Sequence, residues 1–317
     1  MRVELYRMPV ETDDYIKLLK QEADFQSSGH FSLEAKKALE KMQEFRLQDP
    51  SEYILQLVSC AVMRGASQLQ IEINGRDVRV GFDGEAFSAH ELEQIFDCAS
   101  QHSQHPLTAS GAHLAIALQA MHTYNPDVLI VESRDGAGRN VLQLYEEKVW
   151  IETLTGPVSN QKMTTYVGFE RSLTLFNLCF PSLVGAYRAE HGLLRQWAFA
   201  SPIPITVNGS QVPFFTGTDP ILLEGPGRAP IWAKNRVFGR TIKNHSCWGL
   251  AERSSARQGE LNLIQAGICF RQSDKNVRQG LALYLQEDSL RRDLSQRGLI
   301  KNEARNLLIE AAWAVLQ

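Results

Sequence analysis

Residues 49–87 read DPSEYILQLVSCAVMRGASQLQIEINGRDVRVGFDGEAF, and this stretch decides the fold. Asp49 followed by Pro50 is typical of a helix start, because the aspartate can cap free N–H groups and proline suits the first helical turn. Gly65 is typical of a helix end, where the backbone turns left-handed. The apolar residues between these signals predict a largely buried helix from about 50 to 64.

A β-hairpin follows the helix. Apolar and polar residues alternate over 69–73 and again over 78–82, which is the period of a half-buried strand. Asn74-Gly75 between them predicts a two-residue type I′ turn. Residues 83–87, DGEAF, then form a glycine-containing loop at the exit of the hairpin.

The rest of the chain alternates helices and strands in two groups. We expect helices at 31–46 (capped by Ser32), 90–100 and 113–121, a loop at 101–111, and strands at 128–133, 140–146, 148–154 and 164–170. Later strands are expected at 202–209, 261–270 and 280–286, with a last helix at 301–317. We divide the chain into an N-terminal arm (1–30), a first domain (31–172), a helical connector (173–196) and a second domain (197–317).

Composition narrows the class of protein. The 317 residues carry a net charge of −3, which offers no electrostatic footprint for nucleic acid. The N-terminus lacks an apolar signal run, and no run of 18 apolar residues occurs, so we expect a cytoplasmic protein without membrane contact. The five cysteines are scattered and odd in number, and predict reduced thiols.

Several segments together resemble the gyrase, chaperone, histidine-kinase and MutL ATPase superfamily, called GHKL. Residues 56–66 are similar to its first-helix motif ELVDNAIDAGA, and 81–88 to its DNGxGMS loop. Residues 98–103 resemble the following ATSK, 110–118 the glycine-rich lid, and 163–169 the GTxV strand. The resemblance implies an α+β fold whose first domain is a two-layer α/β sandwich (Bergerat fold).

The second half is similar to the 90-kDa heat-shock chaperones of that superfamily. Residues 194–207 resemble the entry to their middle domain, 230–235 their KPIWTRN, and 287–297 their SEDLPLNVSRE. The resemblance implies a smaller α/β domain of the ribosomal S5-like type. Nothing matches the family's C-terminal dimerisation domain, so we expect it to be absent, and a monomer or an oligomer built from other surfaces.

The resemblance also implies which positions would form a nucleotide site, and two of its active groups differ here. Gln56 stands at the position of the catalytic glutamate, and an amide cannot accept a proton from water as a carboxylate does. Cys60 replaces the asparagine whose oxygen binds Mg²⁺, a hard cation that has little use for sulfur. Ser59 stands where an aspartate is common. Alternatively, these three residues simply pack a helix face against its neighbours.

The adenine-binding aspartate has two candidate positions. Strict alignment places Phe82 there, on the same strand face as the other apolar residues, while Asp83 begins the loop. Gly84, Gly111 and Thr165 complete the positions that the resemblance assigns to nucleotide binding. ATP with Mg²⁺ is a possible cofactor if this divergent site still works, and otherwise we expect none.

Two further clusters have alternative interpretations. Gln296 aligns with the family's γ-phosphate arginine and Arg297 is one position away; Arg291, Arg292 and Arg297 could instead form a solvated basic face. Cys98, His102 and His105 could mark a zinc site, although a fourth ligand is not evident.

The leading hypothesis is a chaperone-like GHKL protein with a degenerate nucleotide site that acts by binding a protein client or partner. The alternative is a slow ATP-hydrolysing chaperone in which Asp83 binds adenine and Arg297 contacts phosphate. A third hypothesis is a MutL-like module associated with nucleic acid, which the net charge makes less favourable.

Overall fold

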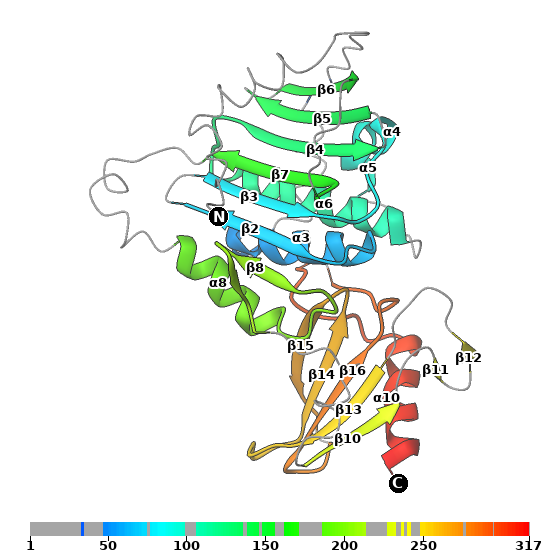
Figure 1. Cartoon of the computed structure of the whole chain (residues 1–317). Coiled ribbons are helices and arrows are strands. Elements are labelled where there is room, and N and C mark those ends of the chain that lie inside the picture. Colours follow the sequence, from blue (N-terminus) through cyan, green and yellow to red (C-terminus); the bar gives the residue numbers. More distant parts are fainter. Residues whose placement is uncertain are drawn as a thin grey trace, which may run out of the picture.

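A computed structural model describes most of the chain in two sheet-containing parts (Figure 1). The described residues are 33–34, 47–74, 77–98, 106–135, 138–145, 148–155, 162–170, 186–213, 227–232, 236–237, 240–241, 248–274, 277–293 and 295–316. The N-terminal arm (1–30) lies outside them. Helices and strands occur in both parts, which confirms the expected α+β class.

The first part is built on a nine-stranded sheet. Its strands, in sheet order, are β1 (Leu33–Glu34), β6 (Lys148–Thr155), β5 (Gly138–Tyr145), β4 (Leu129–Asp135), β7 (Thr165–Glu170), β3 (Asp77–Phe82), β2 (Leu69–Ile73), β8 (Ile205–Val207) and β9 (Ser210–Gln211). Neighbouring strands are antiparallel except β2 and β8, which run parallel. The predicted hairpin is confirmed as β2 and β3, which pair from Leu69–Phe82 to Ile73–Val78.

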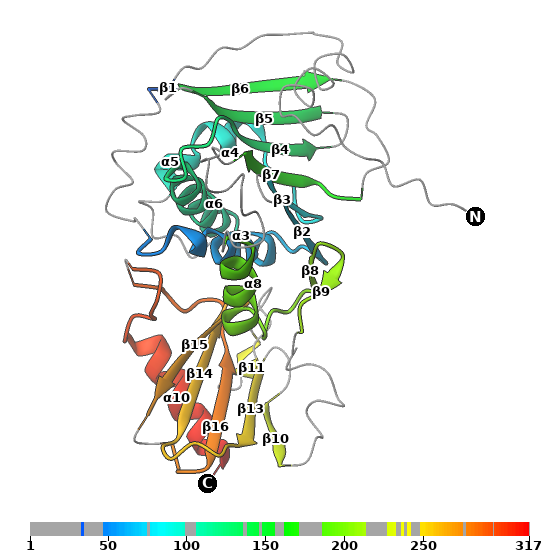
Figure 2. The ribbon, with the colours of Figure 1, turned by 90° about the vertical axis from the view of Figure 1, so that its left-hand side faces the viewer.

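Helices cover one face of this sheet (Figure 2). They are the short 3-10 helix η2 (Pro50–Glu52), α3 (Tyr53–Met63), α4 (Ala89–Glu93), α5 (Ile95–Cys98) and α6 (Pro106–His122). The expected cap is present: the Asp49 carboxylate accepts from the backbone N–H of Ser51 at 2.9 Å, and Pro50 opens the helix. Gly65, with φ of 69°, ends it in the left-handed conformation that glycine favours.

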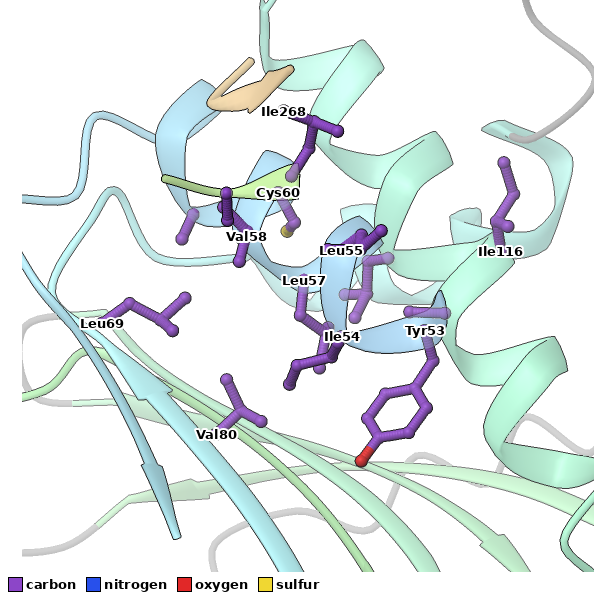
Figure 3. Packing of buried hydrophobic residues seen from close by; sticks show 14 of the residues in the cluster. Tyr53, Ile54, Leu55, Leu57, Val58, Cys60, Leu69, Val80, Ile116 and Ile268 are labelled. Atoms are coloured by element: carbon purple, nitrogen blue, oxygen red, sulfur yellow. The ribbon is translucent and has the colours of Figure 1, made fainter. Parts of the chain in front are cut away.

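The core lies between α3, α6 and the sheet (Figure 3). On β2, the residues Leu69, Ile71 and Ile73 are buried and the two between them are exposed, as the alternation predicts. Helix α3 is buried on nearly every side, because the sheet, α6 and the second part of the chain all contact it.

The second part contains a five-stranded sheet with one helix. In sheet order its strands are β10 (Arg228–Trp232), β13 (Trp248–Arg253), β16 (Leu281–Gln286), β14 (Glu260–Gln265) and β15 (Ile268–Ser273), and the helix is α10 (Glu303–Leu316). A separate pair consists of β11 (Arg236–Val237) and β12 (Arg240–Thr241). Residues 261–270, expected as strand, form the β14–β15 hairpin, whose turn residues Ala266 and Gly267 both have positive φ.

Two expectations about local structure are wrong. The helix predicted over 31–46 cannot include Leu33–Glu34, which pair with β6 as strand β1; the sheet offers these residues backbone partners that an isolated helix start does not. The loop predicted over 101–111 is too long, since α6 already begins at Pro106. Small residues there, including the buried Ser110 and Gly111, allow α6 to pack closely against α3.

The division between the two sheets differs from the expected domain boundary at 197. Strands β8 and β9 extend the first sheet beside β2, and α8 (Ala186–Trp197) packs on α3 and η2. The connector expected at 173–196 is therefore helical from Ala186 onward, and residues 173–185 lie outside the described part. The second sheet begins with β10.

None of the helices in the described part combines the length and the apolar character needed to cross a bilayer.

Candidate functional site

The polar face of α3 meets the second part of the chain. Arg292, in the segment after β16, donates to the Oγ of Ser59, to Gln56 Oε1 at 3.4 Å and to Gln265 Oε1 at 2.6 Å. Ser59 in turn donates to the backbone carbonyl of Ala266 at 3.1 Å. Gln56 and Ser59, which the sequence placed on neighbouring parts of one helix face, are thus joined to residues more than 200 positions away. We call Gln56, Ser59, Gln265 and Arg292 the junction cluster.

His113 on α6 completes the surroundings of Gln56. Its Nδ1 lies 2.8 Å from Gln56 Oε1, and because that amide oxygen only accepts, Nδ1 carries the hydrogen. Burial, and secondly the charge of Arg292, lower the pKa of His113 well below its usual value. The imidazole is therefore neutral at physiological pH, which avoids a second positive charge beside Arg292.

Arg292 is the charged member of the junction cluster. Burial lowers the pKa of its guanidinium to about 9, an effect that Asp288 partly offsets. It therefore remains protonated at neutral pH, and its ring neighbour Phe270 lies 5.3 Å away, measured to the ring centre. The sequence offered Arg292 only as part of a basic face, and no local signal distinguished it from Arg291.

Little free space remains beside Gln56. The β14–β15 turn lies against α3, where a side-chain Cβ at Gly267 would come within 3.1 Å of Val62. The adjoining cavity, lined in part by Glu52, Gln56 and Arg292, has a volume of about 10 Å³. This is roughly the space of one water molecule. A triphosphate does not fit there without separation of α3 from the second part of the chain.

Cys60 faces the apolar core and not a polar site. Its side chain is fully buried, and Figure 3 shows Ile268 of β15 over the same stretch of α3. Burial raises the pKa of the Cys60 thiol to about 12, with a smaller opposing effect from Arg64. A protonated, enclosed thiol offers no ligand to a hard cation.

The choice between Phe82 and Asp83 is resolved by strand direction. Phe82 points to the helix-covered side of β3 and is fully buried in the core, between its pairing partners Leu69 and Thr165. Asp83 lies just beyond the strand end and accepts hydrogen bonds from the Ser67 backbone N–H at 2.7 Å, the Ser67 hydroxyl and the Gln68 N–H. Asp83 therefore holds the α3–β2 connection, while the position directed into the layer is filled by a phenyl ring.

We expect Asp83→Ala to lower stability in a pH-dependent way. Although partial burial opposes ionisation, the hydrogen bonds from Ser67 and Gln68 lower the pKa of Asp83 in the folded protein. Its contribution is therefore present above the unfolded pKa, near 4, and disappears as pH falls through the folded pKa. Urea unfolding should show a loss of about 1 kcal/mol at pH 7 that shrinks at pH 3.

The control is Glu85→Ala, which removes an exposed carboxylate two residues away. It should change stability little at either pH. A loss for Asp83→Ala that is equal at pH 7 and pH 3 would contradict the hydrogen-bonded carboxylate as its cause.

Thr165 and Gly84 help to hold the loop after β3. Thr165 Oγ1 lies 3.0 Å from Ser133 Oγ, which accepts from the backbone N–H of Phe87 at 2.7 Å. Gly84 fits against the end of α3, where an added Cβ would come within 2.7 Å of the Arg64 carbonyl oxygen. Both expected site residues therefore have structural contacts in this arrangement.

Arg64 was not singled out from the sequence, yet it anchors the same loop. It is almost fully buried, donates to the Ala86 carbonyl at 3.1 Å and pairs with Glu91 at 2.5 Å. Its guanidinium lies 3.6 Å from the centre of the Phe87 ring. The loop DGEAF is therefore held by an arginine at the distance of a cation–π contact.

The remaining predicted residues lie apart from the junction cluster or have other partners. Gly111 lies inside α6, not in a glycine-rich lid loop. Arg297 pairs with Glu52 at 2.7 Å and donates to Gln48 at 2.9 Å, while Gln296 bonds the backbone carbonyl of Asp293. Arg297 thus adds a second polar link between the two parts of the chain.

A metal site receives no support from the described part of the chain, where no group of three or more His, Cys, Asp or Glu side chains converges. Cys98 ends α5. His102 and His105, the other members of the predicted triplet, lie outside the described residues.

The geometry can therefore fix one part of the chain against the other, and as it stands does not hold a nucleotide. Comparison with known proteins adds no family: a scan against protein-family models gives no match, and a search of curated proteins finds no significantly similar sequence.

Proposed function

We propose that the chain is a chaperone-like protein of the GHKL fold with a degenerate nucleotide site, and that it acts through contacts with a protein client or partner. The order of elements supports the fold assignment: a capped helix, a hairpin, a glycine loop and further strands follow one another, with helices on one face of the sheet. The motif resemblances described above fall in this order.

The observation that carries the degenerate site is the occupancy of its expected positions. Phe82 is enclosed in the core, and Gln56 is bonded to His113 and Arg292. Phosphoryl transfer depends on a positioned water and on electrostatic stabilisation by Mg²⁺ and cationic groups. An amide at Gln56 and a buried thiol at Cys60 supply neither a base nor a metal ligand.

The slow-ATPase alternative is less well supported. It requires Asp83 to bind adenine, but this carboxylate accepts three hydrogen bonds from Ser67 and Gln68. It also requires Arg297 to contact phosphate, whereas Arg297 is paired with Glu52. Both residues would have to exchange their present partners for the ligand.

Calorimetric titration with Mg-ATP and with Mg-ADP tests the proposal. We expect no heat of binding in the micromolar range for either nucleotide, because the expected adenine position is filled by Phe82. Micromolar binding that Asp83→Ala abolishes and Glu85→Ala leaves intact would overturn the degenerate-site proposal and revive the ATPase.

An aggregation assay tests the chaperone-like part separately. Light scattering of a thermally unfolding model enzyme should decrease when the chain is added, to the same extent with and without Mg-ATP. No decrease at equimolar or higher concentration would count against a client-binding role even if nucleotide binding is absent.

A further inference from the structure

The sheet of the first part has a second face, opposite to α3 and α6, that carries its own side chains. Strand alternation directs Val128 and Ile130 of β4 to this face, where they form a small buried apolar cluster with Val141 and Leu154. Tyr166 of β7 points the same way, because its neighbours Thr165 and Val167 are directed to the core. This face is where the sheet has most room.

Two glycines leave the middle of this face without side chains. Gly81 of β3 pairs with Tyr166 of β7, and Gly168 of β7 pairs with Ile130 of β4. A Cβ at Gly81 would come within 3.1 Å of the Tyr166 ring, so the glycine allows that ring to lie close to the strand. Glycine within a strand is otherwise unfavourable, and here it exposes bare backbone as the floor of a hollow.

A cavity of about 180 Å³ lies over this floor. Its apolar lining includes Val128, Ile130 and the Tyr166 ring. It differs from the cavity beside Gln56 in both place and size, since that one lies at the junction and holds only about 10 Å³. A hollow of this size, lined by apolar groups with polar groups at its margin, has the composition of a small-molecule site.

The charged groups at its margin are mostly acidic. Among the described residues that line it, the carboxylates are Glu72, Asp77, Glu132 and Glu170, and the cation is Arg79. Glu72 faces Arg79 directly across β2 and β3, and Glu132 pairs with Arg134 at 2.7 Å. The excess negative charge is therefore concentrated at the end formed by Asp77 and Glu170.

Asp77 and Glu170 face each other across β3 and β7. Like charges in directly opposite positions destabilise a sheet, unless a positive group approaches them. The Oδ1 atom of Asp77 is buried without a hydrogen-bond partner, although Oδ2 accepts from Asn74 at 3.0 Å. A donor cation entering the hollow would satisfy this oxygen and reduce the repulsion.

We propose that this hollow binds a flat, apolar organic cation, such as an aromatic amine, with its ring over Gly81 and Gly168 and its positive group toward Asp77 and Glu170. The glycine floor accommodates a planar body, and the acidic end selects its charge. This site is independent of the proposed function, because it lies on the opposite face of the sheet from α3.

Three acridine probes test the charge and shape requirement: proflavine (cationic), acridone (neutral) and acridine-9-carboxylate (anionic), each followed by fluorescence anisotropy with the full chain. We expect proflavine to bind at least about tenfold more tightly than the other two. Equal affinity for all three, tighter binding of the anion, or no binding of proflavine would overturn the proposal.

Variants locate the binding. Glu170→Gln should weaken proflavine about tenfold, whereas Glu152→Gln, on the same face but on β6 and outside the hollow, should leave it unchanged. Gly168→Val fills the floor and should abolish binding of proflavine; circular dichroism checks that it folds. If it does not fold, the Glu170→Gln and Glu152→Gln pair decides alone, and equal effects of these two would overturn the site.

Discussion

Replacing Phe82 by alanine is expected to destabilise the protein by about 3–5 kcal/mol, the range found when a buried aromatic side chain is deleted from a packed core. The Phe82 ring is fully buried between the sheet and the helices. Its removal leaves a cavity that the neighbouring Leu69 and Thr165 on adjacent strands fill only in part. Equilibrium urea unfolding followed by tryptophan fluorescence and circular dichroism measures the loss.

The matched control is Leu307→Ala on α10, where the leucine is 43% exposed. It should change stability by only about 0.5 kcal/mol, as surface truncations commonly do. If Phe82→Ala costs no more than this control, the ring does not fill the core. Phe82→Asp, which restores the acidic residue of the resembled family, should be still more damaging, because it buries a carboxylate without a partner.

The second large effect is expected for Arg292→Ala. This change removes the donor that serves Ser59 and Gln56 on α3 and Gln265 on β14. Buried oxygens left without a donor cost about 1–3 kcal/mol each, so we expect a total loss of about 2–4 kcal/mol after partial rehydration. The unfolding transition should also broaden or split, since the two sheets lose their common polar contact.

Arg291→Ala is the control, because this neighbouring arginine is exposed. Arg292→Lys should recover only part of the stability, since one ammonium cannot reproduce the spread of the guanidinium donors. Limited proteolysis gives a second measurement: Arg292→Ala should be cut between the two sheets faster than Arg291→Ala. Indistinguishable unfolding of the two alanine variants would show that the junction cluster contributes little.

Local sequence signals predicted most of the elements. The cap at Asp49, the stop at Gly65 and the strict alternation in the hairpin act through neighbouring residues, so they can be read without knowledge of the fold. The prediction failed where a distant element decides. Residues 33–34 become strand because β6 offers backbone partners, and α6 begins at Pro106 because α3 accepts its small residues.

The site divides in the same way. Alternation alone indicated that Phe82 points inward, and the structure confirms this direction. Nothing local indicated that His113 would reach Gln56, or that Arg292 rather than Arg291 would reach Ser59. Those contacts join residues tens to hundreds of positions apart.

By itself the sequence determined the capped helix, the hairpin and glycine loop of residues 49–87, the α+β class, and the loss of carboxylate and oxygen ligands at Gln56 and Cys60. Only the tertiary structure decided that α3 is fastened to the second sheet through Arg292, and that Asp83 holds a connection while Phe82 fills the layer. The physical reason is range: capping and alternation depend on adjacent residues, whereas burial and hydrogen-bond partners depend on which distant segments the fold brings together.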